Sequence, residues 1–395
     1  MKIYREEHPA DPRALKFFPP GSLTLDIETT GLRKETDMII LIGCTYPEKD
    51  RLHLIQWFND DAVSEEEMLR EFLAFLQGRS GPLITFNGER FDIPFLKAHL
   101  NYNDMSDSPY SHPLIDSFTS LDLYREIHCF SHLFSMERST QKDWEIHMGI
   151  CREDRISGAQ VITCYKEYLK TKDQELGSLI LLHNRDDILH LASLPALLSY
   201  RQLTDNELVP ESMEESMENE QISLSFRLGL PEEIIQPLVV ETGSGKIEAG
   251  PETGKLILTI PIQQGRMYHY YPDYRNYFYL PAEDRAIHKS VGVYVDRAHR
   301  EKARPETAYV SSESIFLPLP LERSSHGFNT EVILSLPKYK KAYDDIREYL
   351  NLDDLLRETG FSEDWKTYLN AMIHEILLQK IKSEKKKKQT RKKRK

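Results

Sequence analysis

Residues 23–31 read Leu-Thr-Leu-Asp-Ile-Glu-Thr-Thr-Gly, and this stretch decides how the first half of the chain is interpreted. Apart from its two acids, the run is apolar or β-branched and ends in glycine, which predicts a strand and the turn after it. Side chains two positions apart on a strand share a face, so Asp26 and Glu28 are expected side by side. Leu25 and Ile27 would then face the core. Adjacent carboxylates repel, and a bound divalent cation is the usual compensation. A solvated strand end is the alternative for this stretch taken alone.

Two further polar clusters occur at predicted helix starts. Residues 87–92 read Asn-Gly-Glu-Arg-Phe-Asp and follow a predicted strand, so Asp92 is expected at a helix N-terminus, where the helix dipole favours an anion. A simple capping role is the alternative for Asp92. Residues 183–187 read His-Asn-Arg-Asp-Asp and open the last predicted helix of the domain. His183 and Asp187 are four residues apart and share one helical face, although a solvated first turn would look the same.

The order of the predicted elements defines a fold class. Three strands joined by short turns predict an antiparallel meander. Helices and further strands then alternate, which predicts an α/β domain with a mixed sheet and helices on both faces, the ribonuclease H-like arrangement. The predicted strands are 22–28, 38–46, 52–58, 83–86 and 112–117, and the predicted helices begin at 64, 91 and 183. Residues 101–180 are interpreted as a helical insertion without assigned chemistry.

Four carboxylates thus occur in the order Asp-x-Glu, Asp, Asp. The pattern closely resembles the DEDD superfamily of 3′–5′ exonucleases, ribonuclease H-like in fold, and within it the bacterial YprB-like group of predicted exonucleases. The motifs that carry the resemblance are Asp-Ile-Glu-Thr-Thr-Gly at 26–31, Asn-x-x-x-Phe-Asp at 87–92 and His-x-x-x-Asp at 183–187. The resemblance covers about residues 20–200, roughly half of the chain.

The resemblance implies a metal-dependent 3′–5′ exonuclease that uses two ions, Mg²⁺ or Mn²⁺, on nucleic acid. Oxygen ligands suit these cations, and two of them can stabilise both the attacking and the leaving oxygen of a phosphodiester. Asp26 would bridge both ions, Glu28 and Asp187 would complete one or both coordination spheres, and Asp92 would hold the second ion. His183 would orient or deprotonate the attacking water. The substrate, DNA or RNA with a single-stranded 3′ end, would meet Thr29, Asn87 and Phe91.

The last motif departs from the family pattern. The family has either a tyrosine with three residues between it and the aspartate, or a histidine with four. Here His183 and Asp187 have the tyrosine-type spacing, and the histidine-type spacing would end on Ile188, which cannot be a ligand. The identity of the fourth ligand therefore stays open between Asp187 and Asp186, and so does the role of His183.

Composition divides the chain further. Residues 1–20 are interpreted as an N-terminal arm, 21–203 as the exonuclease domain, 204–222 as an acidic linker and 223–381 as a second α+β domain of no recognised family. Residues 382–395 carry ten Lys or Arg and one Glu, so this tail has +9 of a net charge of −12 and the remainder has −21. The tail is expected to be disordered and either to solubilise the chain or to engage a polyanion locally.

Other features limit the function classes. No apolar run approaches the ~20 residues of a membrane helix. Four cysteines without paired or zinc-like spacing favour reduced thiols in a cytoplasmic protein, and no obligate protein partner can be read. Two alternatives to the exonuclease remain, a binding module that does not cut nucleic acid and a structure-selective endonuclease. The aromatic segment 268–279 would either stack unpaired bases or fill a half-buried sheet.

Overall fold

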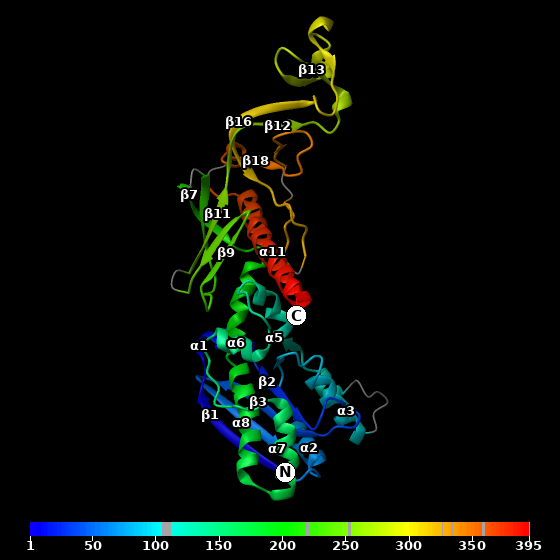
Figure 1. Cartoon of the computed structure of the whole chain (residues 1–395), viewed down its shortest axis with the longest axis vertical. Helices are drawn as coiled ribbons and strands as arrows, with labels where there is room; N and C mark the ends of the chain where they lie inside the picture. Colours follow the sequence, from blue (N-terminus) through cyan, green and yellow to red (C-terminus); the bar gives the residue numbers. More distant parts are fainter. Residues whose placement is uncertain are drawn as a thin grey trace. The chain divides into compact units, whose positions relative to one another are not determined.

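The computed structural model describes residues 1–104, 112–218, 221–251, 254–325, 327–332, 335–357 and 360–394. The chain forms two compact units, one of Met1–Ser131 with Ser135–Ser199 and one of His132–Phe134 with Tyr200–Lys395 (Figure 1). In the described part of the chain, no helix has both the length and the apolar character that crossing a membrane requires.

A six-stranded mixed sheet organises the first unit. Its order is β1-β4-β3-β2-β5-β6, in which β2, β3 and β4 form the predicted antiparallel meander, β1 joins β4 antiparallel, and β5 and β6 add parallel to β2. The bounds are β1 (Lys2–Pro9), β2 (Leu23–Thr29), β3 (Ile39–Glu48), β4 (Arg51–Phe58), β5 (Leu83–Thr85) and β6 (Ser120–Asp122).

Helices cover both faces of this sheet, as the sequence predicts for the α/β class. On one face, Trp57 of β4 packs with Phe72 of α2 and Phe95 of α3 in a buried cluster. On the other face, Phe58 packs with Tyr165 of α7. The helices are α1 (Pro12–Leu15), α2 (Glu65–Leu76), α3 (Asp92–Asp104), α4 (Pro113–Asp116), α5 (Leu123–Ile127), α6 (Gln141–His147), α7 (Gly158–Thr171) and α8 (Gln174–Leu191), with 3₁₀ segments at His128–His132 and Leu194–Leu203.

Three local predictions in this unit are wrong. Residues 1–20 are not an extended arm, because β1 pairs with β4 from Lys2 opposite Phe58 to Pro9 opposite Arg51; its polar residues belong to an edge strand. Residues 112–117 form α4 rather than a strand, since Pro113 starts the helix and the sixth strand is Ser120–Asp122. His183 does not open its helix, because α8 starts at Gln174 with Asp173 as its N-cap.

The described residues of the second unit form three antiparallel sheets. The five-stranded sheet has the order β7-β8-β11-β10-β9, the four-stranded sheet β12-β16-β18-β17 and the three-stranded sheet β14-β13-β15. The strands are β7 (Val209–Glu218), β8 (Gln221–Gly229), β9 (Leu238–Thr242), β10 (Gly245–Ala249), β11 (Lys255–Pro261), β12 (Gln263–Tyr270), β13 (Tyr277–Leu280), β14 (Arg285–His288), β15 (Glu301–Lys302), β16 (Tyr309–Pro318), β17 (Lys338–Tyr339) and β18 (Tyr349–Asn351).

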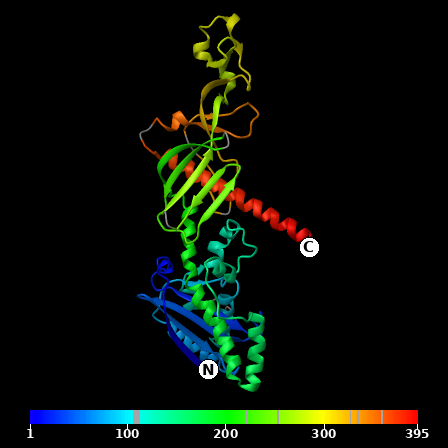
Figure 2. The same ribbon diagram turned by 60° about the vertical axis from the view of Figure 1, so that its left-hand side comes forward.

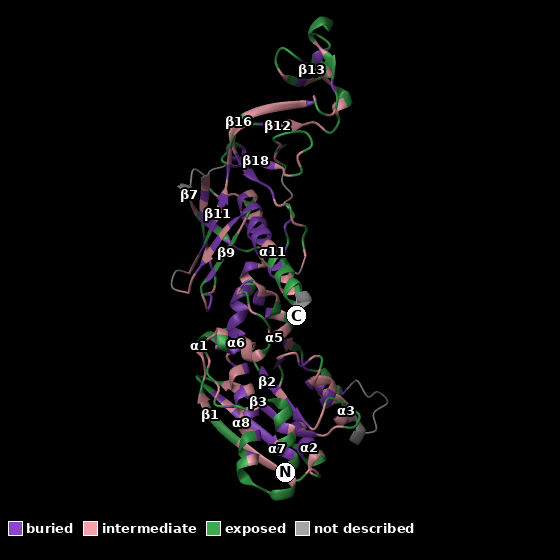
Figure 3. Cartoon of the chain, viewed as in Figure 1, coloured by how far each residue is buried: buried purple, intermediate pink, exposed green. Residues whose placement is uncertain are grey.

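Helix α11 (Glu363–Arg394) packs on the five-stranded sheet of this unit (Figure 2). Its stretch from Trp365 to Ile381 includes most of the buried apolar residues of the helix, whereas the stretch from Lys382 to Arg391 is largely exposed (Figure 3). The remaining helices are α9 (Lys289–Gly292) and α10 (Leu352–Leu355), with short 3₁₀ turns at Tyr274–Asn276 and Arg297–His299. The predicted α+β class therefore holds for this unit.

Here too the sequence misplaced boundaries. The expected acidic linker 204–222 contains β7, whose Met213 pairs with Phe226 of β8, because the acidic side chains lie on an edge strand with apolar residues between them. The expected disordered tail is the helical continuation of α11 up to Arg394, since Lys and Arg are good helix formers; Lys395 lies outside the described residues.

Candidate metal centre

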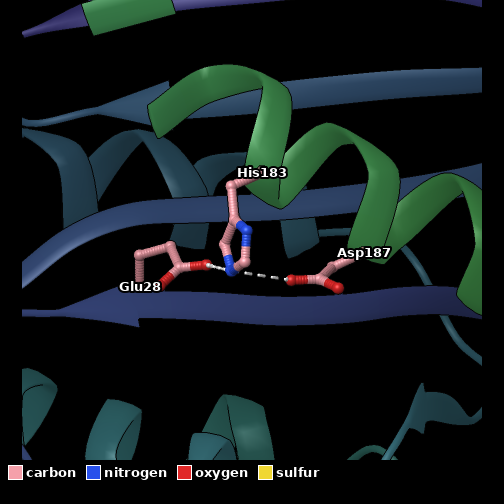
Figure 4. Close-up of side chains that lie close together, drawn as sticks. All are labelled: Glu28, His183 and Asp187. Atoms are coloured by element: carbon pink, nitrogen blue, oxygen red, sulfur yellow. Dashed lines mark ion pairs between the residues drawn. The ribbon is translucent and has the colours of Figure 1, made fainter. Parts of the chain in front are cut away.

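Strand β2 and helix α8 bring one glutamate, one histidine and one aspartate together. Nε2 of His183 lies 3.6 Å from Oε1 of Glu28 and 3.4 Å from Oδ2 of Asp187 (Figure 4). One donor atom of each residue lies within 4.8 Å of the others. The imidazole is 5% exposed and Glu28 is 9% exposed, so the cluster is formed by side chains of limited flexibility.

Asp26 and Asp92 border the same cluster, each held by a hydrogen bond. The backbone N–H of Ile27 donates to Oδ1 of Asp92 over 3.0 Å, which connects the start of α3 to the acidic strand. Nδ2 of Asn184 donates to Oδ2 of Asp26 over 2.9 Å. The structure thus brings together all four carboxylates that the sequence selected, from β2, α3 and α8.

Burial, together with neighbouring negative charges, raises the pKa of the four carboxylates. Burial raises the pKa of Asp26 and of Glu28 well above the usual range, and for both groups the nearby charges of Asp187 and Asp92 add to the effect. Burial also raises the pKa of Asp92 to about 7, against the hydrogen bond from Ile27. Burial raises the pKa of Asp187 despite the opposing charge of Arg152. A site that disfavours its own negative charges in this way is suited to a cation.

Asp26 lies at one end of a row of three paired residues that crosses strands β2, β3 and β4. In the sheet, Asp26 is paired with Gly43 of β3, which is paired with Gln56 of β4. Asn184 lies over this row and accepts from Nε2 of Gln56 over 2.9 Å while donating to Asp26. A Cβ on Gly43 would lie 2.2 Å from Oδ1 of Asn184, so the close approach of α8 to the sheet requires glycine at this position.

Gly43→Ala is therefore expected to displace Asn184 and to lower the free energy of unfolding by about 1–3 kcal/mol, the usual cost of overpacking. The matched control is Gly158→Ala, because a Cβ on Gly158 would have no atom within 4 Å and its helix position favours alanine. Urea unfolding of both variants measures the effect. Equal stability of the two variants would contradict the packing requirement.

The loop between α6 and α7 supplies residues to which the sequence assigned no chemistry. Nη2 of Arg152 lies 2.6 Å from Oδ1 of Asp187, and the same guanidinium binds both oxygens of Glu145 at 2.5 and 2.7 Å. Oδ2 of Asp154 lies 2.8 Å from Nδ1 of His183. The only signal in the sequence is the charged stretch 152–155, and nothing in it indicates which partners it meets.

The structure separates the two neighbouring aspartates of α8. Asp186 is 2% exposed, and its Oδ2 accepts hydrogen bonds from the backbone N–H groups of Glu153 and Asp154, both at 2.8 Å. Asp187 instead faces His183. Asp186 therefore anchors the α6–α7 loop, and the geometry favours Asp187 as the fourth carboxylate of the cluster.

The three residues expected to meet substrate have structural roles of their own. Thr29 is 7% exposed and its hydroxyl donates to the carbonyl of Gly31. Asn87 has a positive φ of 65° in the turn before α3. Phe91 packs against the core, with its ring 5.4 Å from that of Phe95. Their contact with substrate stays a prediction.

Comparison with known proteins identifies the fold of the first half of the chain. Residues 23–199 match the family model described as RNase_H superfamily, which together with the mixed sheet confirms a ribonuclease H-like fold for this part of the chain. The chain is 28% identical over 194 residues to "Uncharacterized protein YprB" of Bacillus subtilis (strain 168). That match covers 48% of this chain and 44% of the relative, so it spans less than half of the relative's length.

Two solved structures resemble the chain weakly. The structure of the family B DNA polymerase from the hyperthermophilic archaeon Pyrobaculum calidifontis has a TM-score of 0.34 and 12% identity, covering 65% of this chain and 35% of the polymerase. A structure titled "ExoI/SSB-Ct complex" has a TM-score of 0.25 and 13% identity, covering 57% of this chain and 54% of that one. With TM-scores this low, neither structure indicates a function for this chain.

Proposed function

We propose that the first unit is a metal-dependent 3′–5′ exonuclease that hydrolyses the phosphodiester bonds of nucleic acid. The observation that carries this proposal is the convergence of Asp26, Glu28, Asp92 and Asp187 at one place in a ribonuclease H-like fold, where burial raises all four pKa values. Repulsion within the set adds to this effect at Asp26, Glu28 and Asp92. Carboxylates are the ligands that Mg²⁺ and Mn²⁺ prefer, so the donor set fits two such ions.

The bound ions would polarise a water and stabilise the charge that develops on the scissile phosphate. The chain's own residues perform the positioning. Asn184 fixes the carboxylate of Asp26, the backbone of Ile27 fixes Asp92, and Arg152 fixes Asp187, so three ligands are oriented before substrate arrives. Such preorganisation avoids the cost of ordering the ligands during the reaction.

Digestion of oligonucleotides labelled at the 5′ end tests the proposal. With Mg²⁺ or Mn²⁺, the protein is expected to give a ladder that shortens one nucleotide at a time, and EDTA should abolish it. Matched DNA and RNA, single-stranded and duplex, define the substrate. Internal fragments would identify an endonuclease instead, and binding without any cleavage would identify a binding module.

The basic end of α11 is expected to add affinity without sequence specificity. Residues 382–395 carry ten Lys or Arg, and counterion release makes such binding steeply salt-dependent. Removing residues 385–395 should flatten the slope of log affinity against log salt. It should also lower the affinity for nucleic acids of every sequence by a similar factor. Fluorescence anisotropy with a catalytically inactive variant measures this slope. An unchanged slope would mean that this segment does not contact nucleic acid.

A further inference from the structure

We infer that His183 is a direct metal ligand through Nε2, and that one ion of the centre consequently prefers Mn²⁺ to Mg²⁺. This inference rests on the proposed function for the presence of a metal, and it assigns to the imidazole a different role from the water-activating one that the family resemblance implies. The two ring nitrogens are held in different ways, and this difference decides the role.

The Nδ1 side of the ring is fixed by Asp154. Oδ2 of Asp154 lies 2.8 Å from Nδ1, and because a carboxylate only accepts hydrogen bonds, Nδ1 is the donor. Asp154 is itself held, since its Oδ1 accepts from the backbone N–H of Ile156 over 2.8 Å and its side chain is 1% exposed. In the neutral imidazole Nε2 then presents a lone pair. A histidine oriented by a carboxylate through one nitrogen is the usual arrangement of a metal-ligating histidine.

The cations near this pair bind oxygens that do not face Nε2. Nζ of Lys142 lies 3.4 Å from Oδ2 of Asp154, and Nη1 of Arg152 lies 3.7 Å from the same oxygen. Both cations therefore stabilise the negative charge of Asp154, and its ionised carboxylate can only accept hydrogen bonds. Arg152 also binds Asp187, but through Oδ1, whereas Oδ2 of Asp187 is the oxygen that faces His183.

The Nε2 side faces two carboxylate oxygens at distances that suit a shared ion. The separations of 3.6 Å from Glu28 and 3.4 Å from Asp187 are longer than the usual N–H···O hydrogen bond. Metal–oxygen bonds of about 2.1 Å at right angles would place neighbouring donor atoms about 3 Å apart, so a small shift closes the set around one ion.

A water molecule fits this position less well than a cation. With both carboxylates ionised, the lone pair of His183 and the oxygens of Glu28 and Asp187 are three acceptors, whereas a water has only two protons to donate. A divalent cation satisfies all three at once. One nitrogen among oxygen ligands favours a transition metal, since Mg²⁺ binds almost exclusively through oxygen and imidazole suits transition metals better. This supports Mn²⁺ over Mg²⁺ at the ion held by His183.

Pulsed electron paramagnetic resonance on substoichiometric Mn²⁺ bound to the full chain tests the inference without relying on activity. Wild type is expected to show ¹⁴N modulation from one directly coordinated imidazole, and labelling histidine with ¹⁵N should change that modulation. His183→Gln should abolish it. Asp154→Asn should weaken it and lower Mn²⁺ affinity on the order of 10–100-fold, because an amide can hold the opposite tautomer.

His53→Gln is the matched control. His53 also lies near two carboxylates, but through different ring nitrogens, with Nδ1 3.6 Å from Glu7 and Nε2 3.5 Å from Glu48. Each nitrogen faces a different carboxylate, so this variant should keep the imidazole signal. Absence of imidazole modulation in wild type, or its persistence in His183→Gln, would overturn the inference.

The outcomes separate this inference from the proposed function. Metal-dependent exonuclease activity without imidazole modulation would keep the proposed function and reject His183 as a ligand. Imidazole-coordinated Mn²⁺ in a protein that cleaves no nucleic acid would do the reverse. Competition of Mg²⁺ against bound Mn²⁺ adds a second readout, in which His183→Gln should reduce the preference for Mn²⁺.

Discussion

Asp26→Asn and Glu28→Gln are each expected to lower nuclease activity below about 1% of the wild-type rate, because even residues that only support a metal ligand typically contribute 10–100-fold. Both carboxylates lie on one face of β2, beside Asp92 and Asp187. Replacing either by its amide keeps the shape of the side chain and removes one anionic ligand. The rate of cleavage at saturating Mn²⁺ is the measurement.

The same variants are expected to unfold at an equal or higher temperature than metal-free wild type. Because burial and like charges raise the pKa of Asp26, Glu28 and Asp92, the native state binds protons more tightly than the unfolded state. Their contribution to stability is therefore present below about pH 4 and is lost as pH rises toward about 7, where Asp92 titrates. At pH 8 the amide variants should unfold at a higher temperature than metal-free wild type, and at pH 4 the unfolding temperatures should be equal.

Glu35→Gln is the control for both measurements, since Glu35 is an exposed acid in the loop that follows the same strand. It should change neither activity nor stability by a measurable amount. Full cleavage by both site variants would exclude the cluster as the catalytic centre. A large loss of stability in metal-free Asp26→Asn would contradict the electrostatic account.

Arg152→Met is expected to destabilise the first unit by about 3–5 kcal/mol, the usual effect of removing one partner of a buried charge pair. Arg152 binds Glu145, whose side chain is 1% exposed, and Asp187. Without the guanidinium, Glu145 and Asp187 lose their shared cationic partner and keep weaker contacts, such as those with His190 and His183. Metal affinity should also fall, because Asp187 loses the contact that orients it. Urea unfolding and Mn²⁺ titration measure the two effects.

The stability difference has a defined pH dependence. Burial alone would raise the pKa of Glu145, but hydrogen bonds from His190 and Arg152 lower this pKa to about 2. A lowered pKa adds stability that is present above the ordinary pKa of 4.5 and is lost as pH falls toward about 2. The difference in the free energy of unfolding between wild type and Arg152→Met should therefore become smaller below pH 4.5. Arg155→Met, an exposed arginine of the same loop, should stay within about 0.5 kcal/mol of wild type.

The sequence predicted the fold of the first unit where local pattern and topology agree. Strands β2, β3 and β4 are rich in apolar and β-branched residues, which suit buried strands, and β3 and β4 are separated by a short turn. The meander and the position of Asp26 and Glu28 could therefore be derived. The edge strand β1 was missed because its polar residues resemble an arm. The start of α8 was misplaced because its first turns lack a clear apolar period.

The sequence could not identify what holds the cluster in place. Asp154 reaches His183 across 29 positions, and Gln56 reaches Asn184 across 128, so no local spacing links them. The first contact depends on how the α6–α7 loop folds back on α8, and the second on how α8 packs on β4, both of which tertiary packing determines. Asn184 had a weak signal, since it follows His183 directly, but only the folded structure shows that it donates a hydrogen bond to Asp26.

Mass spectrometry of the products formed in H₂¹⁸O shows whether the carboxylate cluster of the first unit hydrolyses nucleic acid from the 3′ end. Wild type and Asp26→Asn, purified in parallel, are incubated with a single-stranded oligonucleotide and Mn²⁺. Wild type is expected to release 5′-mononucleotides from the 3′ end with one ¹⁸O in each phosphate, and Asp26→Asn is expected to release almost none. No mononucleotide from wild type, or equal amounts from both proteins, would contradict this expectation.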